Sequence, residues 1–299
     1  MYLSHFQLEQ MPFSLTPNTA FYVELIPHQQ AFEVLQTALS AGEGFIKIVG
    51  EVGTGKTLLC RKLLHHAQEN WRLAYVPDPC LSPTELRWAL AAELGLQYSG
   101  NIDHQQLQQL LQRHLMLLAA RQQQVILVID EAQALPDETL EALRLLTNLE
   151  TEQRKLIQVV LFAQPELDQR LQQHRFRQLR QRISFSYQLR AMTAAEVFAY
   201  VQARLAIAGN PQLKFSMSAM HLLANASRGI PRLVNLLAHK ALMLAYGKGQ
   251  QSITRGHIRA AAYDTEDVKC RRYYGLIAMV VSLFAVLVVS AWWYWGRLL

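Results

Sequence analysis

Short aliphatic runs alternate with longer segments of helical hydrophobic spacing over the first 190 positions of the chain. Residues 125–129, Val-Ile-Leu-Val-Ile, are typical of a strand buried on both faces of a parallel sheet. Short runs of β-forming residues predict four more strands, at residues 45–49, 73–76, 158–162 and 184–188. Helices are expected at residues 29–41, 58–64, 103–120 and 138–149, and after a capping box formed by Ser82 and Glu85. Strands that alternate with helices predict an α/β fold with a parallel sheet.

The pattern changes after Leu189, where helical spacing continues without further strands. Thr193 and Glu196 form a capping box that opens the first of these helices. Three further helices are expected at residues 218–226, 231–246 and 254–263. We therefore expect an α/β domain at residues 1–190 and a small all-α domain at residues 191–266.

The C-terminal part contains a long apolar run, residues 275–295, in which Ser282 and Ser290 are the clearly polar side chains and no residue is charged. Roughly 20 helical residues at about 1.5 Å each span a hydrocarbon core of about 30 Å, so the run predicts a transmembrane helix. The basic residues that flank it are Lys269, Arg271 and Arg272 before the run and Arg297 after it. The positive-inside rule then places the large N-terminal part in the cytoplasm, residues 267–274 in a basic linker and residues 296–299 in a short tail on the far side. The N-terminus has neither the basic nor the apolar region of a signal peptide.

The composition fits a folded chain. Of the 299 residues, 51% are hydrophobic and 17% are charged, which excludes an intrinsically disordered protein. The formal net charge is +6 and the pI is near 9.3, a balance that permits contact with nucleic acid or anionic lipid without requiring it. Three widely spaced cysteines exclude a disulfide framework, form no zinc pattern and fit a reducing compartment, namely Cys60, Cys80 and Cys270.

Residues 50–57 match the phosphate-binding loop pattern G-x-x-x-x-G-K-[ST], between a predicted strand and a predicted helix. The glycines let backbone amides turn inward and the helix adds its positive N-terminus, so that the loop can hold phosphates. Lys56 is expected to reach the β- and γ-phosphates, and the Thr57 hydroxyl to bind Mg²⁺. The residues expected to bind nucleotide here are Gly50, Glu51, Val52, Gly53, Thr54, Gly55, Lys56, Thr57 and Leu58.

The predicted strand at residues 125–129 ends in two carboxylates, Asp130 and Glu131. Ligands bind at the carboxyl ends of strands in open α/β sheets. Asp130 fits a Mg²⁺ ligand of the Walker B type, and Glu131 fits a base that orients and polarises the attacking water. A kinase acting on a metabolite would not need the second carboxylate, so the pair favours hydrolysis. Gln164 follows the next strand and can touch the γ-phosphate or the water, although an ordinary loop glutamine fits its spacing nearly as well.

An arginine-rich stretch leads to the all-α domain, with six arginines within 21 residues, namely Arg170, Arg175, Arg177, Arg180, Arg182 and Arg190. Three interpretations are open. The stretch can be a solvated basic helix, it can bind a DNA backbone, or Arg180 or Arg182 can act as an arginine finger on a neighbouring subunit's nucleotide. Arg232 follows Pro231 at the start of a predicted helix, and is expected to point from the all-α domain toward the nucleotide.

Together these residues resemble the AAA+ ATPases of the ExeA/GspA type, known from general secretion pathways, and most of all the members that serve a mannose-sensitive haemagglutinin type IV pilus. The resemblance covers nearly the whole chain and is carried by the motifs PFSLTP (12–17), GEVGTGKT (50–57), IDEAQ (129–133), QPEL (164–167), RQLRQRI (177–183) and GIPRLVN (229–235). It implies an AAA+ fold in which the strand before Gln164 lies between the P-loop strand and the Walker B strand. It also implies Gln164 as sensor 1, Arg232 as sensor 2, and adenine contacts from the segment that contains Phe21 and His28.

The resemblance further implies ATP and Mg²⁺ as cofactors, a homo-oligomer with a ring as one form, and a membrane partner of the GspB/ExeB kind. Two departures stand out. Ala163 replaces the glycine usual before the QPEL-like run. The secretion members carry a peptidoglycan-binding domain beyond the transmembrane helix, whereas four residues follow Trp295 here, so binding to the cell wall is expected to come from a partner.

The expected function is that of an ATPase anchored in the bacterial inner membrane by one helix, with its ATPase domain in the cytoplasm. It would hydrolyse ATP to drive or regulate assembly of a type IV pilus or a type II secretion apparatus. The alternative is a nucleic-acid-associated AAA+ regulator related to transposition ATPases, which the basic pI and the arginines favour. A third interpretation, a scaffold that binds ATP and barely hydrolyses it, fits poorly with Glu131.

Overall fold

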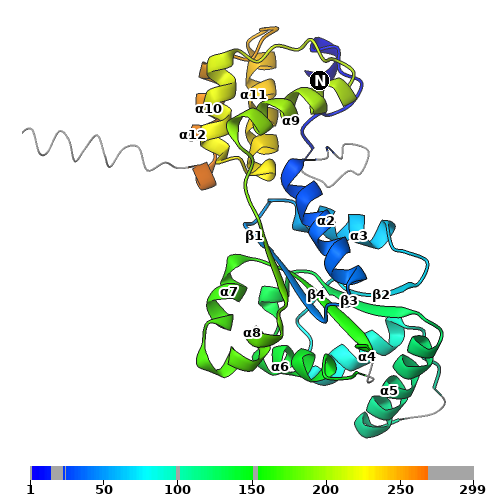
Figure 1. Ribbon diagram of the computed structural model, residues 1–299. Helices are drawn as coiled ribbons and strands as arrows, with labels where there is room; N and C mark the ends of the chain where they lie inside the picture. The colour runs from blue at the N-terminus through cyan, green and yellow to red at the C-terminus, as the bar shows by residue number, and fades with distance from the viewer. Residues whose placement is uncertain (1, 15–22, 24, 99–101, 151–153, 269–299) are drawn as a thin grey trace, which may run out of the picture.

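The computed structural model in Figure 1 describes residues 2–14, 23, 25–98, 102–150 and 154–268. A parallel sheet with helices on both faces forms the lower part of the view, and a group of helices lies above it. The strands are β1 (Phe45–Gly50), β2 (Trp71–Val76), β3 (Gln124–Ile129), β4 (Ile157–Ala163) and β5 (Phe185–Leu189). The lower helices are α2 (Ile26–Ser40), α3 (Lys56–His65), α4 (Pro83–Glu93), α5 (His104–Ala120), α6 (Asp137–Leu146), α7 (Pro165–Leu171) and α8 (Arg177–Arg182), with the 3₁₀ turns η2 (Ala132–Ala134) and η3 (His174–Phe176). The upper helices are α1 (Tyr2–His5), α9 (Ala194–Ile207), α10 (Met217–Ser227), α11 (Pro231–Gly247) and α12 (Arg255–Tyr263), followed by the turn η4 (Glu266–Val268).

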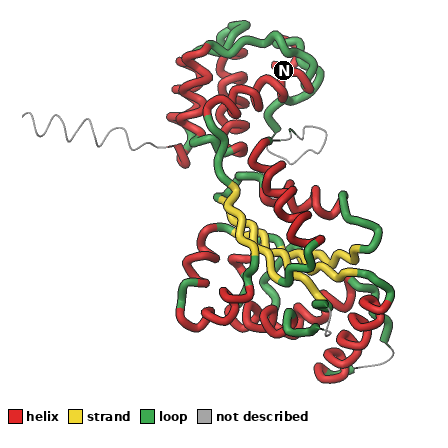
Figure 2. The backbone as a smooth tube through the Cα atoms, in the orientation of Figure 1, coloured by secondary structure: helices red, strands yellow, loops and turns green. Residues whose placement is uncertain are grey.

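The strand order is β2-β3-β4-β1-β5, and every neighbouring pair is parallel. Figure 2 shows the strands gathered in one sheet with helices around it. β4 therefore lies between β1, which leads into the P-loop, and β3, which leads to Asp130. The predicted α/β fold and the strand order implied by the family resemblance are both confirmed. Because parallel strands end at the same edge of a sheet, this order brings the segments after β1, β3 and β4 close together.

Both faces of the sheet are covered, which explains the uninterrupted aliphatic runs in the sequence. On β3, Val125, Leu127 and Ile129 are buried in a cluster that includes side chains of α4 to α8. Ile126 and Val128 point to the opposite face, into a cluster with side chains of α2 and α3. The alternation follows from the two-residue period of a strand.

The upper part, which we call the lid, has a core of its own built from α9 to α12. The first residues of the chain pack in this core, although we expected them in the α/β domain. Tyr2, Phe6 and Phe13 are buried there, and the guanidinium of the buried Arg204 donates from Nε to the carbonyl of Pro12 at 2.6 Å. Since helices already cover both faces of the sheet, these apolar side chains are buried against the lid instead.

Two chain segments cross between the lid and the sheet. At the start of α2, Leu25 is buried in the lid core, whereas Ala31 is buried beside the sheet. At the end of β5, Leu189 is buried in the cluster on one face of the sheet, whereas Met192, three residues later, is buried in the lid core. The second crossing is fixed to the lid by the N–H of Met192, which donates to the carbonyl of Gly229 at 2.9 Å.

Local signals predicted the helix starts better than the helix ends. The capping boxes at Ser82 and Thr193 are both present. By contrast, α6 ends at Leu146 rather than Leu149, since the N–H groups of Asn148 and Leu149 donate to carbonyls three residues back, those of Leu145 and Leu146, instead of four. The helices α7 and α8, with seven and six residues, are too short to give a hydrophobic period.

Among the described residues, no helix is both long and apolar enough to cross a membrane. The predicted span at residues 275–295 lies outside the described part of the chain, as do residues 269–274 and 296–299 on either side of it.

Candidate nucleotide-binding site

The P-loop folds between β1 and α3 in the strand–loop–helix context that its motif requires. Gly53 and Gly55 have φ values of +81° and +99°, a left-handed backbone that other residues rarely adopt. The Thr54 hydroxyl closes the turn by donating to the carbonyl of Glu51 at 2.8 Å. The ammonium of Lys56 donates to the carbonyls of Gly50 at 2.7 Å and Glu51 at 3.1 Å, so its charge is held inside the loop.

Lys56 is almost completely buried, with 5% of its surface exposed. Burial lowers the pKa of its ammonium, and the nearby carboxylates of Glu131 and Asp130 oppose that effect. A lysine held among backbone amides and faced by carboxylates is suited to bind phosphate together with a divalent cation.

Thr57 and Asp130 bring two oxygen ligands together, because the Thr57 hydroxyl is hydrogen-bonded to the Asp130 carboxylate. Asp130 follows β3 and is 4% exposed; burial raises its pKa, while the hydrogen bond from Thr57 lowers it. Mg²⁺ prefers oxygen ligands and usually takes only one or two from the protein beside phosphate and water. The pair therefore fits Mg²⁺, and the described residues hold no group of three or more His, Cys, Asp or Glu side chains that would bind a metal by themselves.

Glu131 is held by two glutamine side chains. Its Oε2 accepts from Gln133 Nε2 at 2.5 Å and from Gln164 Nε2 at 2.9 Å. Partial burial raises the pKa of Glu131, but the hydrogen bonds from Gln133 and Gln164 hold it below its usual value, so the side chain is a carboxylate at neutral pH. The structure thus brings Gln164 to Glu131. Gln133 was not singled out in the sequence, where the one available signal was its place two residues after Glu131 in IDEAQ.

His28 packs under the P-loop at the start of α2. It is 5% exposed, and its Nε2 donates to the carbonyl of Thr54 at 2.8 Å. Burial lowers its pKa, so the ring is neutral at neutral pH. Phe21, the other residue expected near the adenine, lies outside the described residues.

Arg232 reaches the P-loop from the lid. Its backbone N–H donates to the carbonyl of Gly53 at 3.3 Å. The start of α11 therefore lies directly on the phosphate-binding loop.

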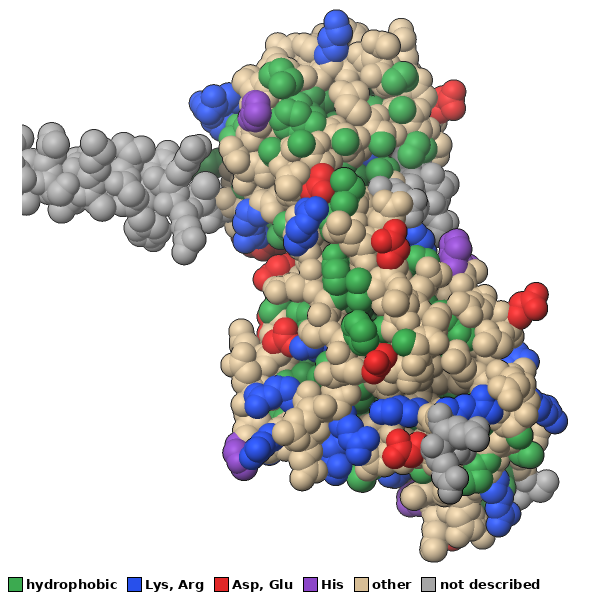
Figure 3. Space-filling model, in the orientation of Figure 1, with side chains coloured by type: hydrophobic (Ala, Val, Ile, Leu, Met, Phe, Trp, Pro, Cys, Tyr) green, Lys and Arg blue, Asp and Glu red, His purple; other side chains and the backbone are tan. Residues whose placement is uncertain are grey.

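Three of the six arginines in the arginine-rich stretch form ion pairs with acidic side chains of the same chain. Arg170 and Arg175 both pair with Asp137, and Arg190 pairs with Glu196. For Arg177, Arg180 and Arg182, on α8, no ion pair forms within the described part of the chain, and no hydrogen bond there links them to the P-loop. On the face drawn in Figure 3, basic side chains are separated by acidic and uncharged ones rather than joined in one patch.

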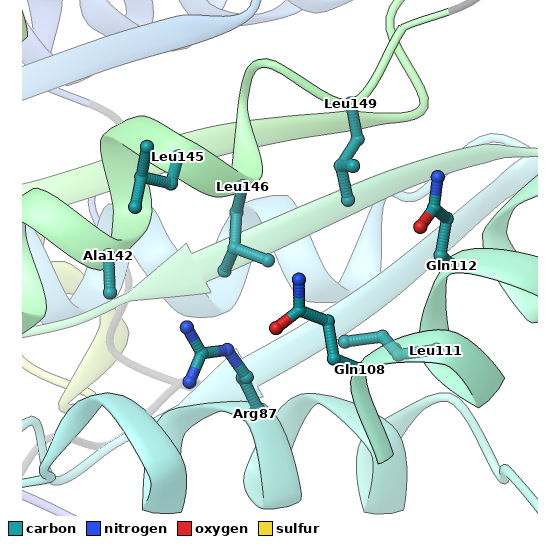
Figure 4. A pocket seen from close by; sticks show the side chains of 8 residues that line it. All are labelled: Arg87, Gln108, Leu111, Gln112, Ala142, Leu145, Leu146 and Leu149. Atoms are coloured by element: carbon teal, nitrogen blue, oxygen red, sulfur yellow. The ribbon is translucent and has the colours of Figure 1, made fainter. Parts of the chain in front are cut away.

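A cavity of about 160 Å³ lies elsewhere, between α4, α5 and α6 (Figure 4). Its lining is mostly leucine and glutamine, and Arg87 is its one charged side chain. It shares no residue with the P-loop, Asp130, Glu131 or Arg232, so the phosphate-binding chemistry lies outside it.

The comparison with protein families matches residues 39–171 to the AAA domain. This part of the chain is therefore similar to that family. Across nearly the whole chain, 295 residues are 39% identical to General secretion pathway protein A of Aeromonas hydrophila. That alignment covers 99% of this chain and 54% of the relative, so the chain spans about half the length of the protein it matches.

Solved structures agree on the fold of the AAA domain and lid. Cdc6p from Pyrobaculum aerophilum matches with a TM-score of 0.64 at 20% identity, over 85% of this chain and 70% of that chain. ORC1 from Aeropyrum pernix, solved in complex with DNA, matches with a TM-score of 0.61 at 20% identity, over 85% of this chain and 69% of that chain. The match to the AAA domain and the secretion-protein relative support an ATPase, and the solved structures show the shared fold.

Proposed function

We propose that this protein is a Mg²⁺-dependent ATPase of the ExeA/GspA type, anchored in the bacterial inner membrane, that drives or regulates assembly of a secretion or pilus apparatus. The observation that supports the ATPase chemistry best is the meeting of Lys56, Glu131 and Gln164 at one edge of three adjacent strands. Carboxylate, ammonium and amide groups at such an edge are what hydrolysis of a phosphoanhydride needs.

Each group has a distinct role in this proposal. The P-loop amides and Lys56 bind the phosphates, and Thr57 and Asp130 hold Mg²⁺, which neutralises phosphate charge. Glu131 takes a proton from the attacking water, which its ionised state permits. Gln164 and Arg232 face the reacting phosphate from the sheet and from the lid.

Two substitutions in the full-length chain test this chemistry. Glu131→Gln should keep ATP affinity within about threefold and lower kcat at least about 100-fold, because it removes the base alone. Lys56→Ala should abolish ATP binding. Glu138→Gln and Lys248→Ala, which change the same charges on exposed positions, are the matched controls. Unchanged hydrolysis in both site variants would contradict the assignment.

We also propose that residues 275–295 span the membrane and that the AAA domain faces the cytoplasm, where ATP and Mg²⁺ are available. The uncharged run and the basic residues before it support this orientation. A reporter fused after Leu299 tests it: alkaline phosphatase should be active, and a fluorescent protein that folds only in the cytoplasm should be dark. The reverse pattern, or release of the protein by a carbonate wash, would remove the anchor from the proposal.

The 39% identity to General secretion pathway protein A supports a role in secretion assembly. Within that class we propose the branch of the pilus protein MshM, working as a homo-oligomer with a membrane partner of the GspB/ExeB kind. Crosslinking in membranes, followed by identification of the linked proteins, tests this: pilus-assembly proteins support the finer assignment, and type II secretion proteins support only the coarser one.

Nucleic-acid binding is the competing outcome. Three of the six clustered arginines pair with acidic side chains of the same chain, which leaves fewer charges for a phosphate backbone. We therefore expect weak DNA binding in a filter assay. Tight binding that falls steeply as salt rises would favour the nucleic-acid alternative instead.

A further inference from the structure

Glu131, Gln133 and Gln164 form a closed ring of hydrogen bonds between the Walker B segment and the end of β4. Two of its bonds converge on Glu131 Oε2, as described above. The third runs from the backbone N–H of Gln164 to Gln133 Oε1 at 3.0 Å. Among the described residues, Gln133 is thus the side chain that hydrogen-bonds both to the Glu131 carboxylate and to the backbone of Gln164, directly after β4.

The two hydrogen bonds of Gln133 allow its side-chain amide only one orientation. A backbone N–H can only donate, so the side-chain atom facing Gln164 N has to be the carbonyl oxygen. The Gln133 NH₂ group is then turned toward Glu131, where it can only donate to a carboxylate. Exchanging the two ends of the amide would place two donors, and two acceptors, against each other.

The backbone that carries this ring is fixed from outside. Arg170 of α7 donates to the carbonyl of Gln133 at 2.6 Å and to that of Leu135 at 2.8 Å. Glu131 itself has φ +51°, a left-handed conformation that strains the backbone of a residue other than glycine. The surrounding contacts therefore hold the Glu131 side chain in a direction that its backbone alone would not favour.

Both donors are directed at the same oxygen of Glu131. Within the described residues, its Oε1 has no hydrogen-bond partner. Because both glutamines bond to Oε2, they fix the orientation of the Glu131 carboxylate. Oε1 is then available to accept a proton from water. If the Gln164 side chain turns toward the γ-phosphate, Gln133 is the donor that still holds Oε2.

We propose that Gln133 is a positioning residue for ATP hydrolysis, which holds the Glu131 carboxylate in place and ties it to the end of β4. The inference rests on the proposed role of Glu131 as the base. Within the described residues, the hydrogen bonds of Gln133 go to Glu131, Gln164 and Arg170 and not to the P-loop, so its loss should slow turnover without weakening ATP binding.

The test compares Gln133→Met, which keeps the length of the side chain without its hydrogen bonds, with wild-type full-length protein. We expect kcat to fall about 10- to 100-fold, because misplacement of a catalytic group by about 1 Å has effects of that size. The affinity for ATP, measured with a fluorescent ATP analogue, should stay within about threefold. Gln109→Met, on the exposed face of α5, is the control and should match the wild type in both measurements.

A second readout does not depend on activity. The amide proton of Gln164 should exchange with solvent at least about tenfold faster in Gln133→Met, because its acceptor is gone. The amide of Phe162, inside β4, should be unchanged. Gln133→Asn keeps the amide but is shorter by one methylene group, so it cannot span the two contacts and should be as slow as Gln133→Met.

The outcomes separate this proposal from the one on which it rests. If Gln133→Met turns over like the wild type while Glu131→Gln is inactive, the positioning role is wrong and the ATPase assignment stands. If Glu131→Gln is active, the assignment of the base has failed. If both Gln133 variants lose ATP binding and melt at lower temperature, Gln133 is structural and the proposal is overturned.

Discussion

Arg232 of the lid and Gly53 of the P-loop are in direct backbone contact, with the N–H of Arg232 donating to the Gly53 carbonyl. A Cβ atom on Gly53 would lie 2.6 Å from the Cβ of Arg232, closer than two carbon atoms can approach. The absence of a side chain at Gly53 therefore sets how closely the lid can close on the loop.

The first prediction is that Gly53→Ala lowers ATP affinity at least about tenfold, because α11 has to move away from the P-loop and residue 53 is strained at φ +81°. Gly42→Ala is a closely matched control: Gly42 has φ +80°, but a Cβ there meets nothing within 4 Å. Titration with a fluorescent ATP analogue measures both. Equal affinities would show that the contact with Arg232 does not govern binding.

The second prediction concerns the attachment of the lid at Gly229. A Cβ there would lie 2.0 Å from the carbonyl oxygen of Met192, in the segment that joins the sheet to the lid. We expect Gly229→Ala to lose about 1–3 kcal/mol of unfolding free energy more than Gly249→Ala, a range typical of overpacking. Gly249 has a similar left-handed backbone, φ +64° against +71°, with open space around it. Urea denaturation of the two variants gives the difference, and similar midpoints would count against a rigid junction.

The third prediction is a pH dependence at the start of α9. Arg190 donates to both oxygens of Glu196, at 2.7 and 2.8 Å. These bonds outweigh partial burial and lower the pKa of Glu196 from 4.5 to about 2. Because the folded-state pKa is depressed, the pair stabilises the fold above pH 4.5, and this stabilisation is lost as the pH falls toward 2.

Glu196→Gln keeps the capping box, since glutamine can occupy that position, but removes the charge. We expect it to cost about 1 kcal/mol at pH 7, a value reduced for the exposure of Arg190, and to cost nothing near pH 2. Glu85→Gln makes the same change in the capping box of α4, where the hydrogen-bond partner is Ser82 and not an arginine, so its effect should be smaller. A pH-independent loss in Glu196→Gln would contradict the ion pair as its cause.

The fourth prediction addresses Arg180 and Arg182 on α8, which make no hydrogen bond to the P-loop within the described part of the chain. If they act on a neighbouring subunit, the double substitution to alanine should lower kcat by about 10³ or more. Mixing these protomers with Glu131→Gln protomers should restore part of the activity, because some interfaces then pair an intact base with intact arginines. Arg177→Ala, on the same helix, should remain active. Mixtures that never exceed either variant, although they assemble, would rule out the arginine finger.

The parts of the fold that follow from local pattern were predicted well. The aliphatic run at residues 125–129 predicted a strand buried on both faces, and the P-loop motif predicted a strand–loop–helix turn; both are present. The capping boxes at Ser82 and Thr193 are decided by residues three positions apart, so the sequence displays them directly. Asp130 and Glu131 could be found because they end a strand that is itself easy to recognise.

Features that depend on contacts distant in the sequence were missed. Gln133 gains its partner only when β4 places Gln164 beside it, 31 positions away. In the sequence, Arg170 is one of six clustered arginines, and nothing there indicates its hydrogen bonds to the carbonyls of Gln133 and Leu135. Likewise, the sequence around Tyr2 and Phe6 does not indicate that these side chains are buried in the lid core rather than against the sheet.

The two crossings between sheet and lid limit how the lid can move. A body joined to another at one point can swing in any direction, whereas a body joined at two points turns mainly about the line through them, as a door does on two hinges. Leu25 to Ala31 and Leu189 to Met192 supply those two points. The two crossings therefore favour rotation of the lid about the line through them over motion in other directions.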